Sequence, residues 1–168
     1  MEVIMKRITI NGLFLLLTIL LFSACGSAQT AAEKAQLAEE IENAVQMPNF
    51  TFEATYAYPS GFKSIYLSPY YSVKVSADTV QAHLPYYGRA YTAPMDPREG
   101  GYLFTSTDFE YQINPGKKAG NWLVNILIND LDRQVVFNFD IFENGTGRLS
   151  VNDVNRQAIS FQGNVTAN

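Results

Sequence analysis

An alternation of apolar and polar residues with a period of two runs through this chain from residue 50 onward. Phe50, Phe52, Ala54, Tyr56 and Tyr58 alternate with smaller or more polar residues. A strand with one face in a core has this pattern, because successive side chains of a strand point to opposite faces. We therefore expect these five residues to share one face of a strand, and the chain to be built mainly from strands.

Further strand candidates follow at short intervals and are separated by turn residues. Turns are indicated by Asp78, Asn114–Gly116 and Asn144–Gly145, because glycine, proline, asparagine and aspartate favour tight reversals. The expected strands cover residues 50–58, 63–67, 71–75, 79–84, 102–106, 109–113, 121–129, 134–142, 147–151 and 158–163. In residues 134–142 the face expected in the core is Val135, Phe137, Phe139 and Ile141.

Nine or ten short strands with close turns predict an antiparallel meander. Such a sheet must curl into a barrel or fold into a sandwich, because open edges pair with other chains. A helix precedes the sheet: Thr30 and Glu33 form a capping-box pattern, and Pro48 ends the segment. Its apolar residues recur at helical spacing, at Leu37, Ile41, Ala44 and Val45. The expected fold is mainly β, with one N-terminal amphipathic helix packed on the domain.

The first 25 residues have the order of a bacterial export signal. Lys6 and Arg7 precede an apolar run, residues 13–22, and small residues lead to Cys25. The run is too short for a transmembrane anchor, which needs about 20 apolar residues. Residues 21–25 resemble the lipobox of bacterial lipoproteins, in which the cysteine is lipidated and becomes the mature N-terminus. The alternative is an ordinary signal peptide with a chance cysteine. We expect a signal peptide at residues 1–24, a lipidated tether at 25–29 and a single domain at 30–168.

The cysteine count and the net charge limit how the domain can be stabilised and what it can bind. Cys25 is the only cysteine, so the mature domain has no internal disulfide and its stability comes from its core. The formal net charge of the chain is −4 at pH 7. Nucleic-acid binding requires clustered Lys and Arg to neutralise phosphates, so we expect no nucleic-acid partner.

No group of residues forms a catalytic, metal or cofactor signature. A Cys–His nucleophile is impossible in the mature domain, and a Ser–His–Asp arrangement would have to use His83, the only histidine. Asp108 with Glu110, and Asp130 with Asp132, are carboxylate pairs that would serve as acid and base or hold calcium. Plain turn chemistry is the favoured interpretation of these pairs. We therefore predict no catalytic residue, no metal and no cofactor.

The long connection at residues 85–101 is the candidate binding segment. Its prolines and glycines block regular structure over a stretch longer than the usual connection of about four to six residues. It carries Tyr86, Tyr87, Arg89 and Tyr91, residue types that stack on sugars or peptides and anchor interfaces. We predict that these four residues bind a ligand. The alternative is that the tyrosines plug one end of the sheet, with Arg89 paired to a carboxylate.

Two segments of the chain resemble a known family. Residues 84–91 read Leu-Pro-Tyr-Tyr-Gly-Arg-Ala-Tyr, and residues 154–163 read Val-Asn-Arg-Gln-Ala-Ile-Ser-Phe-Gln-Gly. They resemble motifs of a family of Bacteroides-type lipoproteins called domain of unknown function 4251, and the likeness spans about residues 50–163. The resemblance implies a β domain on the periplasmic side or the cell surface, and it supplies no activity. Residues 26–29 lack the acidic residues that often follow the cysteine of surface-exposed members, which implies an outer-membrane anchor with the domain facing the periplasm.

Asp78-Thr79-Val80 resembles the O-glycosylation tripeptide of related Gram-negative bacteria. Thr79 is therefore a candidate O-glycosylation site. The alternative is a hairpin turn that enters a strand.

These features predict a lipid-anchored envelope protein that is a non-catalytic binding or structural module. Its expected partners are the membrane, through the lipid anchor, and a glycan, peptide or protein ligand. The alternatives are an envelope enzyme that acts on glycans and an inhibitor-like protein that docks on an exported enzyme. Two carboxyl groups across an open cleft would favour the enzyme, whereas a tyrosine-lined pocket without them would favour binding.

Overall fold

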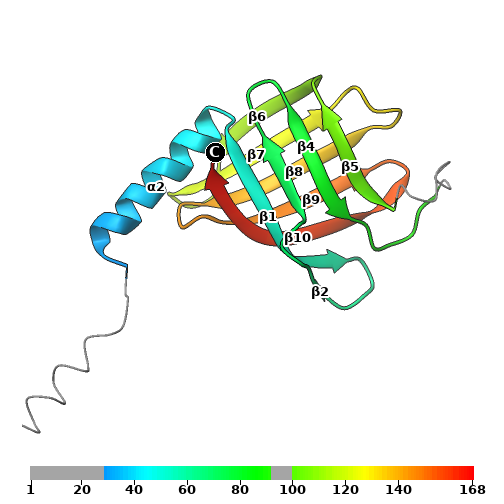
Figure 1. The fold of residues 1–168 in the computed structure, drawn as a ribbon, viewed down its shortest axis with the longest axis horizontal. Coiled ribbons are helices and arrows are strands. Elements are labelled where there is room, and N and C mark those ends of the chain that lie inside the picture. Colours follow the sequence, from blue (N-terminus) through cyan, green and yellow to red (C-terminus); the bar gives the residue numbers. More distant parts are fainter. Residues whose placement is uncertain (1–28, 92–99) are drawn as a thin grey trace, which may run out of the picture. The chain divides into compact units, whose positions relative to one another are not determined.

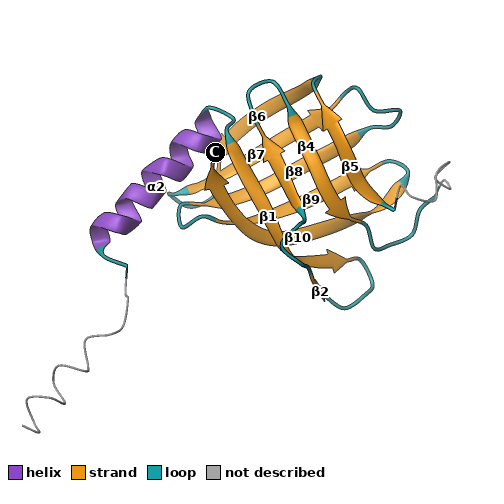
Figure 2. Cartoon of the chain, in the orientation of Figure 1, coloured by secondary structure: helices purple, strands orange, loops and turns teal. Residues whose placement is uncertain are grey.

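The computed structural model describes residues 29–91 and 100–168. Residues 32–168 form one compact unit. The predicted signal peptide, Cys25 and the tether up to residue 28 lie outside the described residues, and so do residues 92–99 of the long connection. The elements drawn in Figure 1 and Figure 2 are helix α2 (Ala31–Gln46) and strands β1 (Phe50–Pro59), β2 (Ile65–Tyr66), β3 (Ser72–Val75), β4 (Val80–Pro85), β5 (Gly101–Ser106), β6 (Phe109–Pro115), β7 (Asn121–Ile128), β8 (Val135–Phe142), β9 (Thr146–Asp153) and β10 (Arg156–Ala167).

Helix α2 lies where the sequence predicts it, directly after Thr30 and before Pro48. It buries Ile41, Ala44 and Val45, which confirms the apolar face read from their spacing. The hydroxyl of Tyr111 donates a 2.6 Å hydrogen bond to the carbonyl oxygen of Val45, so β6 supports the last turn of the helix. In the described part of the chain, no helix combines the length and the apolar character that crossing a bilayer requires.

The strands form one antiparallel sheet that curls into a nearly closed barrel (Figure 1). Strands β3–β5 and β6–β10 are two meanders, in which each strand pairs with the next along the chain. Strand β1 joins the two meanders because it pairs with β3 on one side and with β10 on the other. Of the two architectures expected for a mainly β meander, a barrel and a sandwich, the structure shows the barrel.

A β-bulge in β1 changes which of its side chains face the core. Phe50 and Phe52 are buried, whereas Tyr56 and Tyr58 are 40% and 43% exposed. The register of β1 against β10 shifts between Ala54 and Tyr56, where β1 has one extra residue. The expectation that the alternating residues of β1 share one face is therefore wrong for the two tyrosines, which lie on the outside of the barrel.

The neighbouring strand is adapted to this bulge. Gly163 of β10 lies opposite Ala54, the last residue before the shift. A Cβ atom at this position would collide with the carbonyl oxygen of Glu53. The two backbones therefore approach each other more closely here than any residue with a side chain would allow.

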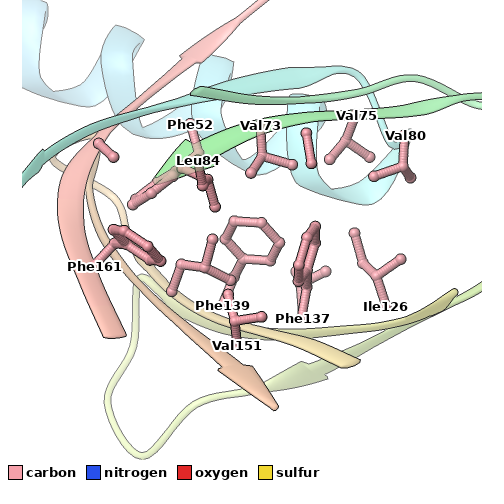
Figure 3. Close-up of a cluster of buried hydrophobic side chains, with 14 of the residues drawn as sticks. Phe52, Val73, Val75, Val80, Leu84, Ile126, Phe137, Phe139, Val151 and Phe161 are labelled. Carbon is pink, nitrogen blue, oxygen red and sulfur yellow. The ribbon is translucent and has the colours of Figure 1, made fainter. Parts of the chain in front are cut away.

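The barrel interior is a continuous core of aromatic and aliphatic side chains, part of which is drawn in Figure 3. The ring of Phe139 makes edge contacts with the rings of Phe50, Phe52 and Phe137, at centroid distances of 5.7, 5.6 and 6.3 Å. The core face predicted for β8 is confirmed, because its four residues are all buried: Val135, Phe137, Phe139 and Ile141.

Candidate functional site

The outward-facing side chains of β1, β2 and β7–β10 form two rows across the sheet. The first row, read from strand to strand, is Tyr66, Tyr56, Gln162, Arg148, Asp140 and Leu123. The second row is Tyr58, Ser160, Ser150, Asn138 and Asn125. The two rows bring tyrosine rings next to amide, hydroxyl and charged groups on one face of a hydrogen-bonded sheet.

A groove of about 540 Å³ lies over these rows. Ser160 and Ser150 have the shortest side chains of the second row, and they lie between Tyr58 and Asn138. We call it the outer-face groove. Its outward-facing residues are Tyr58, Leu123, Asn138, Asp140, Arg148, Ser150, Ser160 and Gln162.

Hydrogen bonds hold polar side chains of the groove in position. The hydroxyl of Tyr58 donates to Oε1 of Gln162 at 3.0 Å. Nδ2 of Asn121 donates to Oδ1 of Asp140 and also to the carbonyl oxygen of Ile141. Side chains fixed in this way would lose little further freedom on contact with a ligand.

Three exposed tyrosines lie at one end of the two rows, beside the groove. The ring of Tyr56 lies 6.5 Å from that of Tyr58 and 5.4 Å from that of Tyr66, measured between centroids. Tyr66 is 71% exposed. The bulge in β1 creates this group, because it turns Tyr56 and Tyr58 outward. We call these three residues the tyrosine cluster.

The described residues that line the groove do not include the carboxyl pair that most glycosidases use. Among the described residues that line it, Asp140 is the only carboxylate, whereas glycosidases place two carboxyl groups about the scissile bond. His83 lies on β4 with its ring 5.3 Å from that of Tyr71, and it does not line the groove. The arrangement can therefore stack against a ligand and hydrogen-bond it, but it offers no acid–base pair.

Tyr86, the first of the predicted ligand-binding residues, is tied into the fold. Its hydroxyl lies 2.8 Å from the carbonyl oxygen of Arg89 and 3.1 Å from that of Gln157. The guanidinium of Arg156 lies 4.9 Å from the centroid of its ring, and the ring of Tyr102 makes an edge contact at 6.0 Å. Burial raises the pKa of Tyr86 above its ordinary value, so the hydroxyl stays protonated. Ligand binding by Tyr86 stays a prediction.

The other predicted residues of this segment differ in their surroundings. Tyr87 is half-buried and packs against the core. Arg89 and Tyr91 are exposed and line a pocket of about 460 Å³ together with Phe62, from the loop after β1. We call this the loop pocket. Its described lining residues are Ser60, Gly61, Phe62, Gly88, Arg89, Tyr91 and Gln157.

Thr79 lies in the tight turn between β3 and β4. Its carbonyl oxygen accepts a 2.8 Å hydrogen bond from the N–H of Ser76, and the strands on either side pair with each other. The turn predicted at Asp78 is thus confirmed, and O-glycosylation of Thr79 stays a prediction.

Asp130 and Asp132, one of the two carboxylate pairs read from the sequence, lie in the connection between β7 and β8. The carboxylate of Asp130 accepts a 3.0 Å hydrogen bond from the N–H of Thr107. Hydrogen bonds from Ser106 and from Thr107 lower the pKa of Asp130 below its usual range. Asp132 pairs with Arg133 at 3.0 Å. Over residues 29–91 and 100–168, no group of three or more His, Cys, Asp or Glu is placed to hold a metal ion.

The sequence of this chain matches a known protein family. The family described as domain of unknown function DUF4251 matches residues 32–165. The chain belongs to the DUF4251 family. The match covers nearly all of helix α2 and of the ten strands, and it confirms the resemblance drawn from residues 84–91 and 154–163.

A solved structure of the DUF4251 family has a similar fold. It is the crystal structure of a family member from Bacteroides eggerthii, with a TM-score of 0.60 and 12% sequence identity. The similarity covers 82% of this chain and 92% of that one. No curated protein matches the chain. At this identity the likeness concerns the fold alone, so the site of this DUF4251 protein has to be judged from its own residues.

Sequence reasoning missed the outer-face groove of this DUF4251 chain. A signal was present, since Asn138 and Asp140 are polar residues on the outward face of a strand whose other face is apolar. The contributions of β1, β9 and β10 depend on register, which the alternation alone does not provide. Phe62 was missed for a similar reason, because only the folded chain brings it to Arg89 and Tyr91.

Proposed function

We propose that this DUF4251 protein is a lipid-anchored, non-catalytic binding protein of the bacterial envelope, and that it holds glycan chains in its outer-face groove. The observation that carries the proposal is the tyrosine cluster beside a groove of fixed hydrogen-bonding side chains.

The chemistry of a sugar ring matches the two kinds of group that the groove offers. A sugar ring presents C–H groups on its faces, which pack on aromatic rings with release of water. Its hydroxyl groups lie around the rim and need donors and acceptors, such as the side chains of Gln162, Asn138 and Arg148. An extended peptide would instead pair with an open strand edge. The groove crosses the face of five paired strands, β1 and β7–β10, which favours a glycan over a peptide.

A binding role, as opposed to hydrolysis, is supported by the single carboxylate of the groove. Asp140 is hydrogen-bonded to Asn121, and no second acid lines the groove in the described residues. With one carboxylate, neither the inverting nor the retaining arrangement of glycosidases can form.

Attachment to the envelope is supported by the leader. Small residues precede Cys25, the only cysteine of the chain, at the end of an export signal. Lipid chains on that cysteine would hold the domain at the membrane surface, because each buried methylene contributes about 0.8 kcal/mol. In this proposal the anchor lies in the outer membrane and the domain faces the periplasm.

Replacing Tyr58 by alanine is expected to weaken glycan binding about tenfold, which corresponds to about 1.4 kcal/mol. The variant removes an aromatic face of the groove and the hydrogen bond to Gln162. Binding would be measured with the full-length protein in mild detergent, on an array of immobilised polysaccharides that includes dextran, xylan, arabinogalactan and polygalacturonate. Far-UV circular dichroism would verify that the variant is folded.

Tyr70→Ala is the matched control, because Tyr70 is 75% exposed and lines neither the groove nor the loop pocket. This variant should bind like the unaltered protein. The glycan proposal is overturned if no polysaccharide on the array is bound, or if Tyr58→Ala binds as tightly as Tyr70→Ala.

Replacing Cys25 by serine is expected to abolish incorporation of labelled fatty acid and to move the protein from the membrane fraction to the soluble fraction. The reason is that serine has no thiol to carry the lipid. Labelling with fatty acid measures lipid attachment. Fractionation of cells on a density gradient measures membrane association and separates the outer from the inner membrane. Unchanged labelling and membrane retention would contradict the anchor.

A further inference from the structure

Backbone pairing joins residues 89–91 of the loop pocket to the start of β10. The N–H of Gln157 donates to the carbonyl oxygen of Arg89 at 2.9 Å, and the N–H of Tyr91 donates to that of Asn155 at 2.8 Å. Ala90 forms an isolated bridge with Arg156. Arg89 and Tyr91, two residues apart in this extended stretch, therefore present their side chains on the same side.

Arg89 brings a positive charge to this pocket that no described carboxylate neutralises. Two other arginines, Arg133 and Arg156, lie 3.0 and 3.8 Å from the buried carboxylate of Asp153. Within residues 29–91 and 100–168, no acidic side chain is in ion-pair distance of Arg89. A guanidinium in such a position can bind a carboxylate through two parallel hydrogen bonds.

Two exposed aromatic rings accompany this charge. Phe62 is 71% exposed and Tyr91 is 65% exposed, and both line the loop pocket with Arg89. The pocket thus combines one cation with flat apolar surfaces, and the side chain of Gln157 and the hydroxyl of Ser60 add hydrogen-bonding capacity. A ring that carries an acidic group matches this combination better than a neutral sugar or a free inorganic anion.

The loop pocket follows the outer-face groove along the same pair of strands. Tyr58 lines the groove and Ser60 lines the pocket, and on the partner strand Ser160 lines the groove and Gln157 the pocket. Two to three residues along a strand correspond to about 7–10 Å. A ligand of a few sugar rings can therefore reach from one cavity into the other.

We propose that the loop pocket recognises the carboxylate of an acidic sugar in a glycan that also occupies the outer-face groove. Arg89 binds the carboxylate, and Phe62 and Tyr91 pack against the sugar ring. The proposal rests on glycan binding in the groove and adds to it a preference for uronate-containing chains.

The test compares each acidic polymer with an ester in which an alkyl group removes the carboxylate charge: polygalacturonate against its methyl ester, and alginate against its propylene glycol ester. The full-length protein in mild detergent is expected to bind at least one of the acids about tenfold more tightly than its ester. Arg89→Gln should abolish this preference, so that the acid and its ester bind equally. Arg89→Lys should retain part of the preference, because it keeps the charge but loses the planar fork.

Lys118→Gln is the charge-matched control, because Lys118 lies in the turn between β6 and β7 and lines neither cavity. It should retain the full preference. Equal binding of acid and ester, failure of all four polymers to bind, or a preference that survives in Arg89→Gln would overturn the inference. In each of these cases, the proposal of glycan binding in the outer-face groove is retained if the protein still binds neutral polysaccharides and Tyr58→Ala still weakens that binding. Both proposals fall if no polysaccharide binds.

Discussion

Replacing Asp153 by alanine is expected to lower the free energy of unfolding by about 3 to 5 kcal/mol, the usual cost of breaking a buried ion pair. The side chain of Asp153 is fully buried, and its Oδ2 atom lies 3.0 Å from Nε of Arg133 and 3.8 Å from Nε of Arg156. Its Oδ1 atom accepts a 2.8 Å hydrogen bond from the N–H of Asn155. The alanine variant removes the buried counter-charge that the two guanidinium groups share. Thermal unfolding should show a Tm lower by about 10–20 °C.

The control for this change is Asp132→Ala. Asp132 pairs with the same Arg133 at the same distance of 3.0 Å, but its side chain is 84% exposed. Exposed ion pairs contribute about 0 to 1 kcal/mol, because water screens the charges. Asp132 thus shares Arg133 with Asp153 but is exposed and lacks the contacts that Asp153 makes with Arg156 and with the N–H of Asn155. If both variants unfold at nearly the same temperature, the buried network does not stabilise the fold as described.

The Asp153 network also supports the segment that forms the loop pocket. Arg156 donates a 3.1 Å hydrogen bond to the carbonyl oxygen of Gly101, and its guanidinium lies 4.9 and 5.2 Å from the ring centroids of Tyr86 and Tyr102. Burial raises the pKa of Tyr102 well above its ordinary value, so this ring stays neutral beside the cation. These contacts link Asp153, through Arg156 and Tyr86, to the carbonyl oxygen of Arg89.

The elements of the fold could be predicted because their signals are local. The capping pattern at Thr30 and the spacing of Ile41, Ala44 and Val45 depend on one helix alone. The alternation in β8 depends on one strand that is buried on one face and faces outward on the other. Turn residues then separated one strand from the next, so the strand count followed as well.

The candidate site could be predicted only in part, because it depends on pairing between distant strands. The extra residue in β1 has no sequence signal. Thr55 fits the alternation of apolar and polar residues in the sequence, but in the folded strand it is the extra residue at which the alternation of faces breaks. This single shift decides whether Tyr56 and Tyr58 belong to the core or to the outer surface. Arg89 and Tyr91 were recognised from their own segment, whereas the loop pocket also required Phe62 and Gln157 from other strands and loops.

Replacing Phe139 by alanine is the second change with a large expected effect, a loss of about 3 to 5 kcal/mol. Phe139 is 2% exposed, and its ring contacts the rings of Phe50, Phe52 and Phe137. Strands β1 and β8 come from different parts of the sheet, and these ring contacts join them across the barrel interior (Figure 3). Rings fixed by several neighbours cannot move far enough to fill the cavity, so both the burial of the ring and its contacts are lost.

Urea unfolding followed by far-UV circular dichroism measures this loss, with Phe62→Ala as the control that removes the same atoms from a side chain that is 71% exposed. The control should change stability by less than about 0.5 kcal/mol. The slope of the free energy against urea should be the same for both variants, because the surface exposed on unfolding is nearly unchanged. A loss below about 1 kcal/mol for Phe139→Ala would mean that the barrel interior is not packed around this ring. In that case β1 would lack the support that keeps Tyr56 and Tyr58 on the outer face.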